Sequence, residues 1–341
     1  MIYWFEELGR EHNDVVGKKC ANLGQMTRMG LAVPPGFALS LEAYRLFVKE
    51  SGLAVEMEKY VQKFGDLKGQ GITVFDEMSK TLRSMIESRE IPGSLKTQIL
   101  GYYKDLSRRL GIDDPAVSVR SAGTESRPGM FETYLNVRGQ EQLLEKVKKV
   151  WASAYTSRAI AFRANKGFPI IGDELGVAIP KMVNARASGI TFTVDPVTAD
   201  DSKILLEANW GLGEGVVSGA ESVDGFVVDK ESMEITARHV GSKVKCVVYT
   251  KEGADWADVP EPMQNMPCIS DEEIIEIAKV AKSAEQSLGG PQDMEWAVDQ
   301  DLEFPKSLFW LQTRPAKVAA KKKVSATSHI ADLIAKKFGG V

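Results

Sequence analysis

The chain has 341 residues, of which 43% are hydrophobic and 26% are charged, and its formal net charge at pH 7 is −4. This length exceeds the usual size of a single domain, so two lobes are expected. The composition is that of a globular protein. The slight acidity and the lack of a basic stripe with interleaved aromatic residues exclude nucleic-acid binding as the main function.

Cysteine and histidine are both scarce, with three residues of each. The cysteines form no CxxC pair, which favours a reducing compartment. Three histidines argue against a histidine-ligated metal site and against a Ser-His-Asp triad. The first residues are too acidic for a signal peptide, and no apolar run approaches the ~20 residues of a membrane span. The sequence therefore predicts a cytoplasmic protein that does not bind a membrane.

Helices dominate the first part of the chain. A short amphipathic helix is expected from residue 17 to residue 29, followed by an extended segment over 33–40 because Pro35 keeps Pro34 away from helical angles. Ser40 marks the start of the next helix. Apolar residues that recur every three to four positions predict packing helices over 40–50, 54–64, 76–89 and 92–110.

The stretch 117–137 carries the first candidate chemistry. A strand over 117–119 ends at Arg120, a loop with Gly123 and Gly129 follows, and a second extended run covers 134–137. Glycine lets backbone N–H groups approach a ligand closely, and N–H groups beside an arginine form a concave anion site. The pattern is typical of a polyphosphate site, and an ordinary hairpin loop with an ion-paired arginine is the alternative.

The pattern changes in the second part of the chain. A long or broken helix is expected over 140–166, a strand over 175–183 and a turn at 187–189, and we place a lobe boundary at 185. Ser270 is the expected N-cap of a helix over 271–288. The tail, 317–341, is rich in lysine and is expected to pack weakly. The predicted strands of this part are 190–194, 203–208, 223–229, 233–239, 243–249, 294–298 and 308–312.

Two pairs of polar residues lie near the end of the chain. Asp293 and Glu295 are two apart on one predicted strand, as are Gln312 and Arg314 on the next, so each pair points to one face. Paired strands would place two carboxylates, an amide and a guanidinium together, a set that suits Mg²⁺ and phosphate. The alternative is a solvated hairpin whose ion pairs contribute at most ~1 kcal/mol each.

A glycine-rich segment, 210–215, has the spacing Gly-x-Gly-x-Gly. It is not a dinucleotide fingerprint, because the third glycine comes early and no helix with a later ribose-binding acid follows. A glycine-rich turn between strands is equally compatible. The phosphate-binding pattern Gly-x4-Gly-Lys-Ser/Thr does not occur.

In combination and in this order, several motifs resemble the nucleotide-binding domain of the phosphoenolpyruvate synthase and pyruvate phosphate dikinase family. The resemblance covers roughly residues 15–316. The motifs are GKKCANL (17–23), PPGF (34–37), SVRS (118–121), TYLNV (133–137), VWAS (150–153), SGITFT (188–193), WGLGE (210–214) and QTRP (312–315).

The resemblance implies an α+β fold of the ATP-grasp type, with ATP held between an N-terminal lobe, 1–185, and a C-terminal lobe, 186–316. Lys19 and Arg120 would hold phosphate oxygens, and Arg314 would face the β and γ phosphates. These three are the implied catalytic residues. Cys20, where many relatives have glycine, departs from the pattern beside Lys19. The resemblance also implies that Gly129, Met130 and Thr133 lie over the triphosphate and that Lys181, Met182 and Val183 lie at the adenine. Asp293 would bind the nucleotide as well, and Glu295 and Gln312 would be the Mg²⁺ ligands.

Members of this family pass phosphate from ATP to a histidine on a mobile domain. The chain is too short for that domain and its acceptor domain, so a partner subunit is expected to carry them, as in phenylphosphate synthase. The nucleotide subunit of a split phosphoenolpyruvate synthase is the alternative. The implied reaction transfers the β-phosphoryl group of Mg·ATP to the partner's histidine and releases AMP and phosphate.

Two other classes of function remain open: an ATP-grasp ligase that forms ADP, and a non-catalytic nucleotide sensor. The retained phosphate and metal residues argue against a sensor. His329 lies in a segment, Thr327-Ser328-His329, that is similar to the carrier motif of the family. Its lysine-rich surroundings and the few residues after it favour a terminal helix over 330–338, capped by Ser328, and not a phosphorylated histidine.

Overall fold

The computed structural model of the chain describes residues 1–318 except 126, 128, 218–221 and 251–252. These residues form two compact units. The first unit comprises residues 1–28, 35–182 and 253, and the second comprises 29–34, 183–250 and the described residues from 254 onward. The chain passes between the units at Met182, whereas the sequence places the boundary at 185. Residues 29–34, expected in the N-terminal lobe, belong to the second unit.

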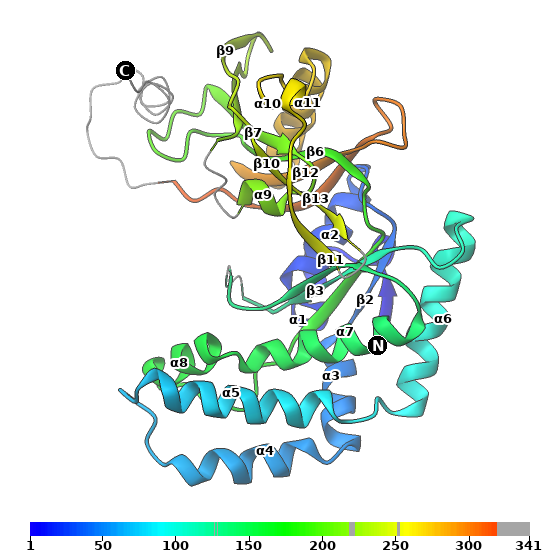
Figure 1. Cartoon of the computed structure of the whole chain (residues 1–341), viewed down its shortest axis with the longest axis vertical. Coiled ribbons are helices and arrows are strands. Elements are labelled where there is room, and N and C mark those ends of the chain that lie inside the picture. Colours follow the sequence, from blue (N-terminus) through cyan, green and yellow to red (C-terminus); the bar gives the residue numbers. More distant parts are fainter. Residues whose placement is uncertain (126, 128, 218–221, 251–252, 319–341) are drawn as a thin grey trace. The chain divides into compact units, whose positions relative to one another are not determined.

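The first unit is built on a five-stranded sheet in the order β1-β2-β5-β3-β4 (Figure 1). All neighbouring strands in it are antiparallel. The strands are β1 (Ile2–Trp4), β2 (Gly36–Leu39), β3 (Val117–Ala122), β4 (Thr133–Val137) and β5 (Gly176–Pro180).

Helices pack around this sheet, and α4, α5 and α7 lie in successive rows on one side of it (Figure 1). Trp151 of α7 is fully buried, stacks on Phe47 of α3 with ring centroids 4.9 Å apart, and donates its indole N–H to the carbonyl of Leu175 over 3.1 Å. The helices are α1 (Asn13–Val16), α2 (Lys18–Arg28), α3 (Leu41–Glu50), α4 (Leu53–Val61), α5 (Ile72–Glu87), α6 (Gly93–Leu110), α7 (Gln140–Ala152) and α8 (Ser157–Lys166).

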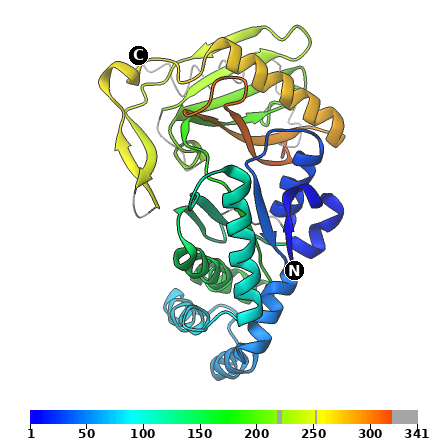
Figure 2. The same ribbon diagram turned by 90° about the vertical axis from the view of Figure 1, so that its right-hand side faces the viewer.

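The second unit is built on a six-stranded antiparallel sheet in the order β13-β12-β6-β7-β8-β9. Helix α11 (Asp271–Leu288) packs along strands of this sheet, as Figure 2 shows in gold. The strands are β6 (Ala185–Phe192), β7 (Lys203–Trp210), β8 (Asp224–Asp229), β9 (Ile235–His239), β12 (Gln292–Asp299) and β13 (Leu308–Pro315). A separate ribbon contains β10 (Lys245–Thr250) and β11 (Gly253–Asp258), and two short helices are α9 (Glu214–Val217) and α10 (Glu261–Gln264).

The structure confirms the expected α+β class and most of the expected elements. The hydroxyl of Ser270 accepts a hydrogen bond from the N–H of Glu273 and caps α11, as predicted. The helix expected over 140–166 is broken into α7 and α8 by a 3₁₀ turn at Ser153–Tyr155. The turn expected at 187–189 is wrong, because β6 runs through it without interruption. The predicted tail helix, 330–338, lies outside the described residues.

No helix in the described part of the chain combines the length and the apolar composition that a membrane crossing requires.

Candidate functional site

In the first unit, the start of α2 lies against the end of β3. The N–H of Lys18 donates to the carbonyl of Gly123 over 2.8 Å. Gly17 precedes the helix with φ +81°, and a Cβ there would lie 2.0 Å from the carbonyl oxygen of Ala122. Only glycine permits this approach, which brings the first turn of α2 to the strand that carries Arg120.

The first turn of α2 carries Lys18 and Lys19 and no acidic residue. Lysine is unfavourable at the positive end of a helix dipole, and an anion bound there offsets this by about 0.3–1 kcal/mol per charge. A helix start with two lysines is therefore suited to a phosphate group.

Arg120 and Thr133 are paired directly across β3 and β4, and Arg120 faces Ala178 of β5 on its other side. The sheet thus brings together two of the predicted site residues. Burial raises the pKa of the Cys20 thiol to about 12, against the opposing positive charges of Lys19 and Arg120. Both cations therefore lie within electrostatic range of one point in the first turn of α2, and the buried Cys20 is part of the packing.

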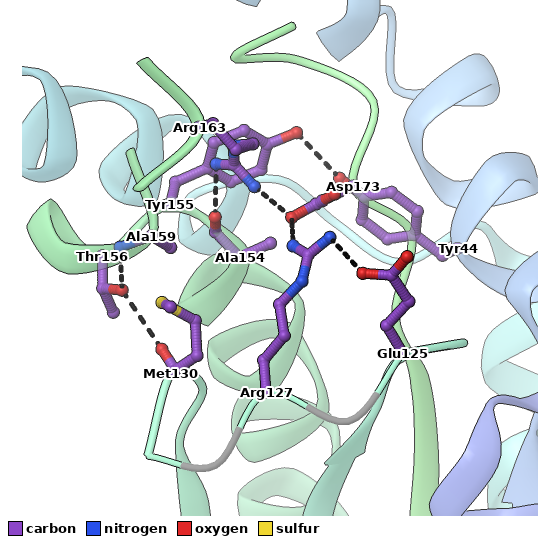
Figure 3. A network of polar contacts seen from close by, with 10 residues as sticks. All are labelled: Tyr44, Glu125, Arg127, Met130, Ala154, Tyr155, Thr156, Ala159, Arg163 and Asp173. Carbon is purple, nitrogen blue, oxygen red and sulfur yellow. Dashed lines mark hydrogen bonds and ion pairs between the residues drawn. The ribbon is translucent and has the colours of Figure 1, made fainter. Parts of the chain in front are cut away.

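The loop between β3 and β4 is tied to α8 through its backbone. Arg158 donates to the carbonyl of Gly129 over 2.8 Å, and the hydroxyl of Thr156 donates to the carbonyl of Met130 over 3.3 Å (Figure 3 shows the second bond). Gly129 has φ +66°, a left-handed conformation that favours glycine. The predicted residues of this loop therefore have a defined support.

The segment expected at the adenine lies at the end of the first unit. The N–H of Lys181 donates to the carbonyl of Pro35 over 2.8 Å, and the N–H of Met182 donates to the carbonyl of Ala116 over 2.9 Å. These two donors are used inside the unit, so any contact with a base falls to other atoms of the segment. Val183 belongs to the second unit.

In the second unit, β12 and β13 bring together all four predicted polar residues. Asp293 is paired with Arg314, and Glu295 with Gln312. The Nε of Arg314 donates to Oδ2 of Asp293 over 2.6 Å, and the Nε2 of Gln312 donates to Oε1 of Glu295 over 3.0 Å. Two acids, an amide and a guanidinium therefore form one ladder on one face of the sheet, which we call the β12–β13 ladder.

Asp293 is the most constrained member of this ladder. It is 8% exposed, and its Oδ1 is buried with no hydrogen-bond partner in the described part of the chain. Burial raises the pKa of Asp293, the ion pair with Arg314 opposes the rise, and the charge of Glu295 adds to it. A buried oxygen with an unmet bonding requirement is costly unless a ligand or cation satisfies it.

A β-bulge separates the ladder from the buried part of the same strands. Glu295 is paired with Gln312, but Trp296 is paired with Trp310, so Leu311 is an extra residue on β13. Because of the extra residue, Trp310 is buried on the same face of the sheet as Trp296, while Gln312 stays on the same face as Glu295.

The ladder fits a hard cation by the chemistry of its donors. Mg²⁺ takes oxygen ligands, and it commonly uses one or two protein groups together with water and substrate phosphates. Since Gln312 uses its N–H in the bond to Glu295, its amide oxygen is the atom it offers to a cation. The described residues contain no group of three or more His, Cys, Asp or Glu side chains arranged to hold a metal.

The sequence did not identify the side chains that hold the loop. Arg127 donates to Asp173 over 2.9 Å, Arg163 is paired with the same carboxylate, and Arg83 makes two bonds to Glu132 over 2.7 and 2.8 Å. These partners come from separate parts of the chain and have no common spacing.

The glycine-rich segment has a packing role in the structure. Gly211 has φ +73°, and a Cβ there would lie 2.2 Å from the carbonyl oxygen of Val247. The short helix α9 begins three residues later. This agrees with the turn interpretation of the Gly-x-Gly-x-Gly spacing.

In the first unit, a helix start with two lysines lies against a strand that carries an arginine, and in the second unit the β12–β13 ladder combines acids with an amide and an arginine. By its chemistry each set suits a phosphate or a divalent cation, which makes a nucleotide-binding protein the candidate class. The family model described as "Pyruvate phosphate dikinase, AMP/ATP-binding domain" matches residues 13–333. The chain belongs to this family of AMP/ATP-binding domains.

Curated relatives support the same family. The chain is 36% identical to a probable phosphoenolpyruvate synthase of Methanocaldococcus jannaschii, over 98% of this chain and 28% of that protein. It is 34% identical to the phosphoenolpyruvate synthases of Aeropyrum pernix and Pyrococcus furiosus, over 96% and 92% of this chain and 43% of each relative. The chain thus spans less than half the length of these relatives. They favour the phosphoenolpyruvate synthase alternative over the phenylphosphate synthase interpretation.

Among solved structures, one similar chain is a dinucleotide forming acetyl-coenzyme A synthetase 1 of Ca. Korarchaeum cryptofilum. The sequence identity is 14% and the TM-score 0.31, over 70% of this chain and 90% of that chain.

Proposed function

We propose that the chain binds Mg·ATP and acts as the nucleotide site of a phosphoenolpyruvate synthase-type phosphotransferase. In this reaction ATP, water and a histidine imidazole yield AMP, inorganic phosphate and phosphohistidine, and the histidine carries the β-phosphoryl group. Family membership and relatives named phosphoenolpyruvate synthase support this function. They also favour pyruvate over phenol as the final acceptor.

The observation that carries the proposal is the β12–β13 ladder. Asp293 with Arg314 and Glu295 with Gln312 are in register and within hydrogen-bond distance. A solvated hairpin would expose these groups, whereas Asp293 is buried with one oxygen unsatisfied in the described residues. A metal-phosphate ligand explains why an acid is kept in this environment.

Each residue has a distinct role in this proposal. Glu295 and Gln312 would hold Mg²⁺, which neutralises phosphate charge when it is bound. Arg314 is held by Asp293 and would face the β and γ phosphates. Lys19 and Arg120 would contact phosphate oxygens from the first unit. The remaining nucleotide contacts would come from Gly129, Met130 and Thr133 at the triphosphate, and from Lys181, Met182 and Val183 at the adenine.

These residues would act by positioning and charge neutralisation, which dominate catalysis of phosphoryl transfer. The nucleophile is the carrier histidine, which we place on a separate carrier domain that docks on the nucleotide-bound chain. We do not assign His329 this role, and it lies outside the described residues.

The nucleotide product tests the proposal. The chain is incubated with Mg·ATP and a carrier domain of a phosphoenolpyruvate synthase, and the spent nucleotide is separated by chromatography. We expect AMP in a 1:1 ratio to phosphorylated carrier, and acid-labile label from [β-³²P]ATP on the carrier. His329→Ala should leave this label unchanged. Stoichiometric ADP would move the chain to the ligase class.

A further inference from the structure

The loop between β3 and β4 has a charged attachment outside the proposed phosphate contacts. We propose that Arg127 is a positioning residue that holds the loop in its ATP-binding conformation by pairing with Asp173. This inference rests on the proposed function, because the loop carries Gly129 and Met130.

Asp173 joins two arginines through a single oxygen (Figure 3). Its Oδ2 accepts from Nη1 of Arg127 over 2.9 Å and from Nη1 of Arg163. Nη2 of Arg127 donates to Glu125 over 3.1 Å. Charges therefore alternate along the chain Glu125, Arg127, Asp173 and Arg163, which we call the anchor network.

The inner end of the anchor network is fixed by burial. Arg163 is 1% exposed, donates to the carbonyl of Ala154 over 2.6 Å and lies over the ring of Tyr155 at 5.3 Å. A buried guanidinium requires a counter-charge, and Asp173 supplies it. Asp173 is thus held by the interior of the unit, and the same oxygen attaches the loop through Arg127.

The outer end of the network is continuous with the predicted phosphate contacts. The N–H of Met130 donates to the carbonyl of Arg127 over 3.2 Å. Arg127 also lies over the ring of Phe162 of α8 at 5.3 Å, and α8 supplies Arg158 to the carbonyl of Gly129 over 2.8 Å. Release of Arg127 would therefore remove one of the contacts that hold the backbone of Met130 near α8.

An ordered loop binds ATP without first losing conformational freedom, so loss of the attachment should weaken binding and leave the bound state intact. Arg127 itself lies between two carboxylates, Glu125 and Asp173, which leaves its charge already matched. This geometry favours a positioning role over a direct phosphate contact.

The experiment measures binding and loop order in the same variants. Binding is measured by calorimetry with Mg²⁺ and β,γ-methylene ATP, and loop order by amide hydrogen exchange at Met130 without nucleotide. Arg127→Gln should raise the Kd about tenfold and raise the exchange rate by a similar factor, since loss of a charged hydrogen bond has this magnitude. The kcat at saturating ATP should stay unchanged, while KM rises.

Arg108→Gln is the matched control, because Arg108 pairs with Asp105 on exposed surface of the same unit, and it should change neither quantity. Asp173→Asn leaves Arg163 without its counter-charge and can unfold the unit. The double variant Asp173→Asn with Arg163→Met removes the buried charge of Arg163 together with its counter-charge, and it should reproduce the Arg127→Gln effects in a folded protein.

Each outcome has one interpretation. A higher Kd with unchanged exchange at Met130 would mean a direct phosphate contact and would overturn the inference. Faster exchange with an unchanged Kd would also overturn it, since loop order would then be irrelevant to binding. Wild-type protein that does not bind the analogue would instead refute the proposed function.

Discussion

The two candidate phosphate-binding regions differ in construction. In the second unit, the β12–β13 ladder consists of four side chains on two paired strands that bond to one another. In the first unit, the predicted residues come from a helix start, two paired strands and a loop, and separate side chains support them. The ladder is held by register, whereas the loop region is held by close backbone approach and by the anchor network.

This difference implies different responses to substitution. Loss of a ladder residue other than the buried Asp293 leaves its partner on a fixed sheet, so the effect should fall on chemistry and metal binding. Loss of a support in the first unit should alter the conformation of the site and therefore affect stability or nucleotide affinity. The following substitutions separate these responses, beginning with the largest expected effect.

Glu295→Ala and Gln312→Ala should each reduce AMP formation by about 10²–10³-fold, which corresponds to ~3–4 kcal/mol, because each removes a group that acts on transition-state charge. The melting temperature should change little. Glu234→Ala is the control, since Glu234 is an exposed acid next to β9 in the same unit. Activity in the two ladder variants within twofold of wild type would remove them from the site.

Lys19→Met should reduce AMP formation by about 10²-fold, as expected for a lost contact to transition-state charge. Lys18→Met removes the same charge from the same helix turn, so it controls for the general field of the helix start. We expect Lys18→Met to have a smaller effect, within about tenfold, because helix-end charges contribute ~1 kcal/mol or less. Equal losses in both variants would show a non-specific electrostatic effect.

Gly17→Ala should lower the free energy of unfolding by at least about 2 kcal/mol, from its left-handed conformation and from the clash with Ala122. Gly30 has nearly the same φ, +80°, but a Cβ there meets nothing within 4 Å. Gly30→Ala should therefore show only the conformational cost. Chemical denaturation of both variants measures the difference, and equal losses would contradict a close approach of α2 and β3.

Asp293→Asn should produce the smallest effect, which depends on pH. Because the pKa of Asp293 is raised in the folded protein, the folded state binds this proton more tightly than the unfolded state does. The contribution of Asp293 to stability is therefore fully present below its ordinary pKa and falls as pH rises to its raised pKa. Across that interval the loss is about 1.4 kcal/mol for each pH unit.

Urea denaturation between pH 3 and pH 8, without Mg²⁺, measures this dependence. The stability of Asp293→Asn relative to wild type should increase with pH across that interval and then level off. A difference that is constant with pH would mean that the environment of Asp293 does not disfavour its charge.

The ladder could be predicted from sequence because strand geometry relates residues two apart, and Asp293 with Glu295 and Gln312 with Arg314 follow that rule. The regular spacing of apolar residues in α11 and its N-cap, Ser270, were also sufficient to locate that helix. The anchor network could not be found in this way. Arg127 and Asp173 are 46 residues apart, and only the packing of the loop against α8 brings them together.

The wrong turn at 187–189 has a packing cause. Gly189 lies within β6, opposite Trp296 of β12, and a Cβ there would lie 2.4 Å from the indole ring. The glycine therefore makes room for a buried side chain and does not bend the chain. Local composition does not distinguish these two uses of glycine, because the tryptophan is more than a hundred residues away.

The bulge at Leu311 decides which residues of β13 face the site. Trp310, Gln312 and Arg314 have the spacing of residues on one face, and only the extra residue moves Trp310 to the opposite face. A single-codon deletion at Leu311 would remove the bulge and make Trp310 and Gln312 neighbours in a regular strand, so the tryptophan would stay buried and the ladder would keep its face. An alignment that puts a gap at this position and still matches Gln312 and Arg314 would therefore equate residues of the same orientation.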